Sequence, residues 1–138
     1  MIVVFGGTND YCHGDAEFGT LGDKTPWTFY GALDMLYQGL IDRCPNAKII
    51  VLTPLPRDDE HEYNRHNHVK ILVDYVVAIK EVANKYNLSV FDLYNGFGIQ
   101  TDEKDGVNKY LADGLHPNDM GYKKLFEIIN QYIMDCMP

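Results

Sequence analysis

The sequence predicts an α/β protein with a parallel sheet, because three short apolar runs alternate along it with three segments of helical periodicity. Of its 138 residues, 46% are hydrophobic, which is enough apolar material for one core. We therefore expect a single domain over residues 1–138, with right-handed crossovers joining successive parallel strands.

The first apolar run begins at the second residue. Residues 2–5 are β-branched or aromatic and are followed by the polar sequence 6–10, which predicts a buried strand that delivers the amide of Asn9 to its carboxyl end. Asn9 and Asp10 are also typical of an Asx turn, a purely structural alternative. The glycine-rich stretch from about Tyr11 to Lys24 indicates a loop over the end of this strand.

The first helix is expected to start at Thr25, whose hydroxyl suits a helix cap, with Pro26 in the first helical position. Apolar residues then recur at helical spacing until Cys44-Pro45-Asn46 ends the pattern. They are Phe29, Leu33, Leu36 and Leu40.

Two further strand and helix pairs follow. Residues 48–54 form a nearly continuous apolar run, as expected for a parallel strand covered on both faces, and residues 89–94 predict a third strand. Between these strands a helix is marked by Val69, Leu72, Val73, Val76, Ile79 and Ala83. A long loop over 95–118 leads to the last helix, marked by Tyr122, Leu125, Phe126, Ile129, Ile133 and Cys136.

Charge and cysteine content narrow the function classes. The net charge of −8 disfavours nucleic acid and anionic membranes as partners. Three widely spaced cysteines suggest neither a disulfide framework nor a zinc site. We find no stretch long enough for a membrane span and no basic region that would open a secretory signal, so we expect a cytoplasmic location.

Two blocks of residues carry the chemistry. The first is Gly7 to Asp10, directly beyond the first strand. The second places Asp113 three residues before His116, in a loop that precedes the last helix. A carboxylate and an imidazole at this spacing can meet within one turn, where the carboxylate orients a general base. Because ligands bind at the carboxyl ends of parallel strands, both blocks are expected at one cleft.

Together these blocks resemble the signature of the GDSL/SGNH hydrolases, a family of serine esterases, lipases and acylhydrolases. The resemblance implies a flavodoxin-like, three-layer α/β/α fold and an oxyanion hole that uses the amide of Asn9 and the backbone near Gly7. It implies that His116 is the general base and acid, and that Asp113 fixes its tautomer. It implies no metal or cofactor, and an ester as substrate.

The family's Gly-Asp-Ser block is absent from this chain, whose only serine is Ser89. Ser89 begins a predicted strand and should lie at the opposite end of the sheet from Asn9. The resemblance therefore makes the chain the later part of the fold, with its first strands missing. The present first strand would then expose an edge, which favours pairing with another chain and a possible homo-oligomer.

The sequence contains three weaker signals. Cys12 lies close to Asn9 and is a conceivable thiol nucleophile, although most isolated cysteines are inert. A loop with His61, His66 and His68 beside Asp58, Asp59 and Glu60 matches no known metal-ligand spacing and suits a solvated helix start. Possible pocket walls, more often plain core, are Tyr11, Phe18, Trp27 and Tyr110.

Two functions fit the sequence. The first is an ester hydrolase with a Ser-His-Asp triad whose serine is supplied from outside these residues. The second is a truncated, non-catalytic domain of the same fold that binds a partner or associates with itself through its first strand.

Overall fold

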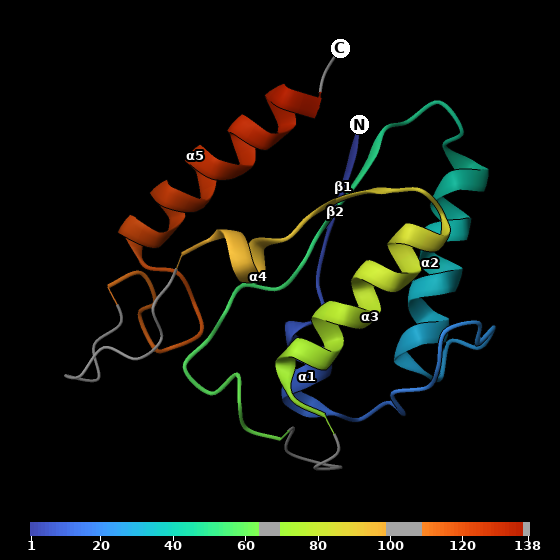
Figure 1. Cartoon of the computed structure of the whole chain (residues 1–138), viewed down its shortest axis with the longest axis horizontal. Helices are drawn as coiled ribbons and strands as arrows, with labels where there is room; N and C mark the ends of the chain where they lie inside the picture. Colours follow the sequence, from blue (N-terminus) through green and yellow to red (C-terminus); the bar gives the residue numbers. More distant parts are fainter. Residues whose placement is uncertain (64–69, 99–108, 137–138) are drawn as a thin grey trace.

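The computed structural model describes residues 1–63, 70–98 and 109–136 (Figure 1). Along the described chain, each strand is followed by one or two helices. The elements are β1 (Ile2–Phe5), α1 (Thr8–His13), α2 (Phe29–Arg43), β2 (Ile49–Leu52), α3 (Leu72–Lys85), β3 (Ser89–Phe91), the short α4 (Leu93–Gly96) and α5 (Asp119–Cys136).

The three strands form one parallel sheet in the order β1-β2-β3. Val4 of β1 is level with Val51 of β2, which is level with Val90 of β3. All four residues of β2 are buried, as expected for a central parallel strand covered on both faces. The predicted α/β class with a parallel sheet is confirmed.

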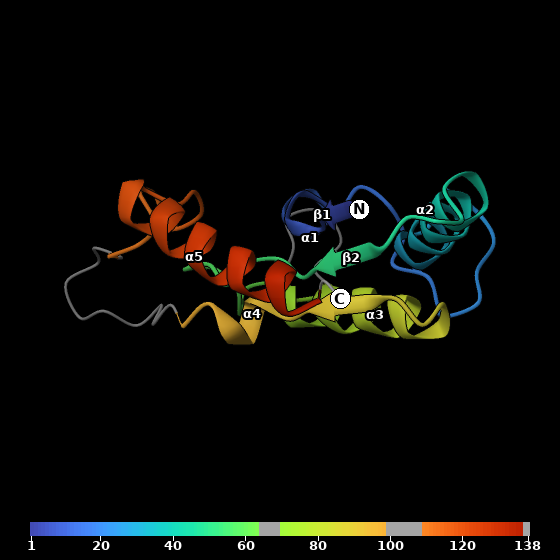
Figure 2. The same cartoon turned by 90° about the horizontal axis from the view of Figure 1, so that it is seen from above.

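Helices cover both faces of the sheet. Val51 points to a core built with α2 and α3, whereas Ile50 and Leu52 point to a second cluster with α5, because successive side chains of a strand alternate between faces. Figures 1 and 2 show α5 on one side of the strands and α2 and α3 on the other. Removing one of these large buried side chains, such as Ile50→Ala, should cost about 2–5 kcal/mol.

The strand β1 lies at an edge of the described sheet, hydrogen-bonded to β2 alone. Because successive side chains of the strand point to opposite faces, Val3 is left 42% exposed and Phe5 50% exposed. These two residues are level with Ile50 and Leu52, and so share the face that α5 covers further along the sheet. An apolar strand with an open edge agrees with the expectation that a neighbouring strand is missing.

Three local predictions were wrong. The segment after β1 begins with the helix α1 instead of an Asx turn and loop, so Asn9 lies in a helical turn. The helix α2 starts at Phe29 because Thr28, not Thr25, is its cap, accepting a hydrogen bond from the Gly31 N–H at 3.1 Å. The third strand stops at Phe91, where Asp92 caps α4.

No helix in the described ranges is long and apolar enough to cross a membrane.

Candidate active site

A cleft of about 410 Å³ lies beyond the carboxyl end of β1. It is where Gly7 and Asn9, from the start of the chain, meet His116, from the loop before α5. Its other lining residues are Phe5, Gly6, Thr8, Asp10, Pro54, Leu55, Leu115, Pro117, Tyr122 and Leu125. The cleft therefore lies where ligands bind in open parallel sheets.

Gly7 controls how α1 leaves the strand. Its backbone φ is 106°, a value that residues with a side chain rarely adopt. A Cβ at this position would also lie 2.9 Å from Ile79 Cδ1. Its carbonyl accepts the first helical hydrogen bond of α1, from the Tyr11 N–H at 3.1 Å. The sharp turn at Gly7 thus places Asn9 in the first turn of α1, exposed at the mouth of the cleft.

Asp113 holds the ring of His116. Its Oδ2 lies 2.8 Å from His116 Nδ1, and its Oδ1 accepts the backbone N–H groups of Leu115 at 3.0 Å and His116 at 2.7 Å. With Nδ1 donating to a carboxylate, Nε2 is the nitrogen left to accept a proton. This is the geometry a general base requires.

The same hydrogen bonds act on the charge of Asp113. The backbone N–H of His116, the His116 ring and the backbone N–H of Leu115 together hold the pKa of this carboxyl far below its ordinary value. Asp113 is therefore an anion throughout the neutral range. An anion at this position favours the imidazolium that forms when His116 takes a proton.

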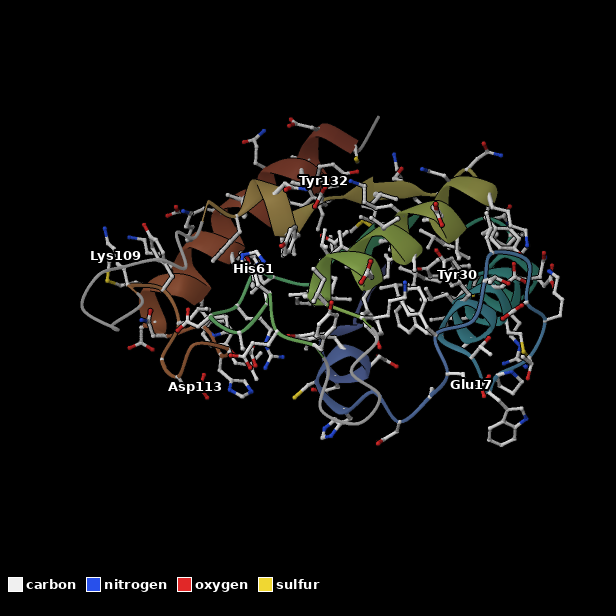
Figure 3. The ribbon with its side chains drawn as sticks, turned by 60° about the horizontal axis from the view of Figure 1, so that its bottom comes forward. Glu17, Tyr30, His61, Lys109, Asp113 and Tyr132 are labelled. Carbon is white, nitrogen blue, oxygen red and sulfur yellow. The ribbon has the colours of Figure 1, made fainter. Side chains whose placement is uncertain are left out.

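The loop that carries this pair is fastened to the first turn of α5. Asn118 caps that helix, accepting the Gly121 N–H at 3.0 Å, and donates its own amide to the Lys109 carbonyl at 2.9 Å. Gly121 packs so closely that a Cβ would lie 2.2 Å from the Tyr110 carbonyl oxygen. Figure 3 shows Asp113 on this loop, whereas Tyr132 lies toward the opposite end of α5.

Two other candidate nucleophiles lie outside the cleft. Ser89 is the first residue of β3 and lines a different hollow with Lys48 and Ile49, at the amino ends of the strands. Cys12 is in α1, but its sulfur faces the guanidinium of Arg57 at 3.9 Å. Among the described residues that line the cleft there is thus an amide and an imidazole but no serine or cysteine, and its side-chain hydroxyls are those of Thr8 and Tyr122.

The histidine-rich loop does not assemble a metal site in the described part of the chain. His66 and His68 lie outside the described residues. His61 Nε2 lies 3.3 Å from Glu60 Oε1, and no group of three or more potential ligands is found among the residues that the structure describes.

The predicted aromatic walls are placed elsewhere. Tyr11 and Phe18 pack with Tyr75 in the core, Trp27 is 79% exposed, and Tyr110 packs against Phe97. Of the aromatic rings, Phe5 and Tyr122 line the cleft instead. The sequence did not reveal them because Phe5 belongs to a strand pattern and Tyr122 to a helix pattern, and neither pattern shows that a side chain lines a cleft.

The chain matches the model of the GDSL-like Lipase/Acylhydrolase family over residues 1–124. It belongs to this family. It is 35% identical over 83 residues to an acetylxylan esterase of Xylanibacter ruminicola, a match that covers 59% of this chain and 15% of that protein. It is 27% identical over 137 residues to the platelet-activating factor acetylhydrolase IB subunit alpha2 of Rattus norvegicus, covering 99% of this chain and 53% of that protein.

Solved structures give the same fold. A protein from Lactobacillus plantarum aligns with a TM-score of 0.88 at 27% identity, over 99% of this chain and 67% of that one. A lipase/acylhydrolase from Enterococcus faecalis aligns with a TM-score of 0.63 at 26% identity, over 99% of this chain and 62% of that one. The chain thus spans about half or less of the length of these two curated relatives, and about two thirds of these two solved chains.

Proposed function

We propose that this chain supplies the acid–base pair and an oxyanion donor of a serine ester hydrolase, and that the serine comes from a segment outside these 138 residues. One observation carries the proposal: Asn9 and His116 line the same cleft, and His116 is held by an ionised Asp113. Membership of a family of lipases and acylhydrolases supports an ester as the substrate.

The proposed chemistry assigns one step to each group. The serine oxygen attacks the ester carbonyl carbon while His116 Nε2 takes the hydroxyl proton. The carbonyl oxygen becomes negative and accepts a hydrogen bond from the Asn9 amide, with the backbone near Gly7 shaping its approach. The tetrahedral intermediate then releases the alcohol, which takes the proton from His116. Water next attacks the acyl-serine carbonyl and gives a proton to His116; the serine oxygen leaves, takes that proton back, and the carboxylic acid is released.

The direct test is a chimera that carries, in front of Met1, the Gly-Asp-Ser segment of one of the aligned relatives. We expect the chimera to hydrolyse p-nitrophenyl acetate and the isolated chain to show no enzymatic turnover. Replacing the added serine by alanine, or His116→Ala, should remove activity, since a triad without its nucleophile or base loses on the order of a millionfold in turnover. Hydrolysis by the isolated chain that survives Ser89→Ala but not His116→Ala would contradict the proposal.

A second function is favoured by the open edge of β1. Val3 and Phe5 are exposed on a strand whose other edge pairs with no strand in the described ranges, and through such an edge a non-catalytic domain would pair with another chain. In that case the isolated chain would form a stable dimer, and the chimera would remain inactive.

A further inference from the structure

Arg57 is a buried cation beside the cleft that the proposed chemistry does not use. It lies in the segment after β2 and is only 3% exposed. A charge removed from water to this degree requires partners that satisfy it. Its partners identify what it does.

The guanidinium joins its own turn to α1. Its Nε and Nη2 both donate to the carboxylate of Asp59, a bidentate pair in which the Nη2 bond is 2.9 Å. Nη1 donates to the Thr8 hydroxyl at 3.3 Å and Nη2 approaches the Cys12 sulfur at 3.9 Å. The guanidinium carbon also lies 5.2 Å from the centre of the Tyr11 ring. Thr8, Tyr11 and Cys12 are on α1, the helix that carries Asn9.

Tyr11 strengthens the same junction. Its hydroxyl donates to the carbonyls of Asp59 at 2.5 Å and Glu62 at 2.9 Å. Burial, and then the charge of Asp59, raise the pKa of Tyr11 to about 12, so the phenol keeps its proton and remains a donor at neutral pH. The helix α1 is thus bound to the Arg57 turn from two sides.

The next residue of that turn contacts the loop that carries His116. The backbone N–H of Asp58 donates to the Gly114 carbonyl at 2.9 Å. Gly114 has a φ of 77°, and a Cβ there would lie 2.5 Å from Asp58 Oδ2, so the two segments are in close contact. Gly114 lies between Asp113 and His116, the proposed acid–base pair.

We propose that Arg57 is a positioning residue that fixes α1, and with it Asn9, relative to the loop that carries Asp113 and His116. The catalytic benefit of this positioning rests on the proposed function, but the positioning itself can be tested without any ester. Lysine should not replace Arg57, because an ammonium cannot span Asp59 and Thr8 with a planar fork.

The test is Arg57→Ala in the 138-residue chain, read by the NMR signals of the Asn9 side-chain amide and the His116 ring. We expect both signals to shift or broaden, and to return to their wild-type positions when guanidinium is added below denaturing concentrations. Ammonium should not restore them. The matched control is Lys85→Met, which removes a cation from the buried Asp34 ion pair between α2 and α3; it should leave both signals in place.

A folded Arg57→Ala chain with both signals at wild-type positions would overturn the inference, and so would equal restoration by ammonium. If Arg57→Ala does not fold, Thr8→Val decides, because it removes one bond to α1 and keeps the guanidinium. The His116 ring signal should then shift, and an unmoved His116 signal would contradict the proposal. In the active chimera, Arg57→Lys should lower kcat about 100-fold with a smaller change in KM. An inactive chimera would count against the proposed function and not against the role of Arg57, because the NMR experiment uses the 138-residue chain without the added serine.

Discussion

Asn9 and His116 line one cleft although almost the whole chain separates them in sequence. The parallel sheet explains this, because β1 delivers Asn9 to its carboxyl end and the connection before α5 returns to the same end. Each of the two groups is fixed locally, Asn9 by the turn at Gly7 and His116 by Asp113.

Asn9→Ala in the active chimera should lower kcat about 100- to 1000-fold, the usual cost of removing one oxyanion donor. KM should change little, since the bond strengthens only as the carbonyl oxygen becomes negative. Asn9 is exposed, so the melting temperature should be unchanged. Asn46→Ala, an exposed asparagine in the turn between α2 and β2, is the matched control and should leave kcat unaltered. Equal kcat values in the two variants would exclude the role assigned to Asn9.

Gly7→Ala should destabilise the chain by about 1–3 kcal/mol, because alanine rarely adopts a φ of 106° and its Cβ would meet Ile79. Urea unfolding followed by circular dichroism measures this difference. Gly6→Ala is the matched control, because a Cβ there meets no atom within 4 Å. Similar free energies of unfolding for both variants would show that the turn at Gly7 is not constrained as described.

Asp113 should titrate well below the ordinary pKa of an aspartate, as followed by carbon NMR of its carboxylate. Since its folded pKa is lowered, its contribution to loop stability is present above the unfolded pKa and is lost as pH falls through the folded value. His116→Ala should raise this pKa only in part, because the backbone N–H groups of residues 115 and 116 remain. An ordinary pKa for Asp113 in the wild-type chain would be inconsistent with the described hydrogen bonds.

The open edge of β1 should make the isolated chain self-associate as its concentration rises. Val3→Lys should weaken this association in analytical ultracentrifugation, since it places a charge on the exposed apolar side of the strand. Val77→Lys is the control, because Val77 on α3 is similarly exposed but lies away from the edge. A chain that stays monomeric at all concentrations, or equal effects of the two lysines, would contradict this prediction.

The sequence predicted the elements whose periodicity reflects burial. The fully buried run of β2 and the amphipathic pattern of α3 could be identified because each presents its apolar residues to the sheet or the adjoining helix. The sites of Asp113 and His116 were also recognisable, since three residues of separation suffice for their contact. Their catalytic roles stay predictions.

The short elements could not be predicted because tertiary contacts determine them. The helix α1 has only six residues, too few to be stable alone, and depends on Tyr11 and on Arg57 from a distant turn. Either Thr25 or Thr28 could have capped α2. Thr28 is the cap, and its hydroxyl is held in place by donating to Asp23 at 2.9 Å. The role of Arg57 had no sequence signal, since nothing in its surroundings predicts burial of a charge.

The central claim is that Asn9, Asp113 and His116 form one site that activates a serine supplied from outside the chain. Labelling of the chimera with a fluorophosphonate probe, followed by mass spectrometry, tests it most directly, because the serine oxygen displaces fluoride only when a base takes its proton. We expect the label on the serine of the added Gly-Asp-Ser segment, and its loss in His116→Ala. Labelling of Ser89, or labelling of the added serine that is unchanged in His116→Ala, would contradict the account.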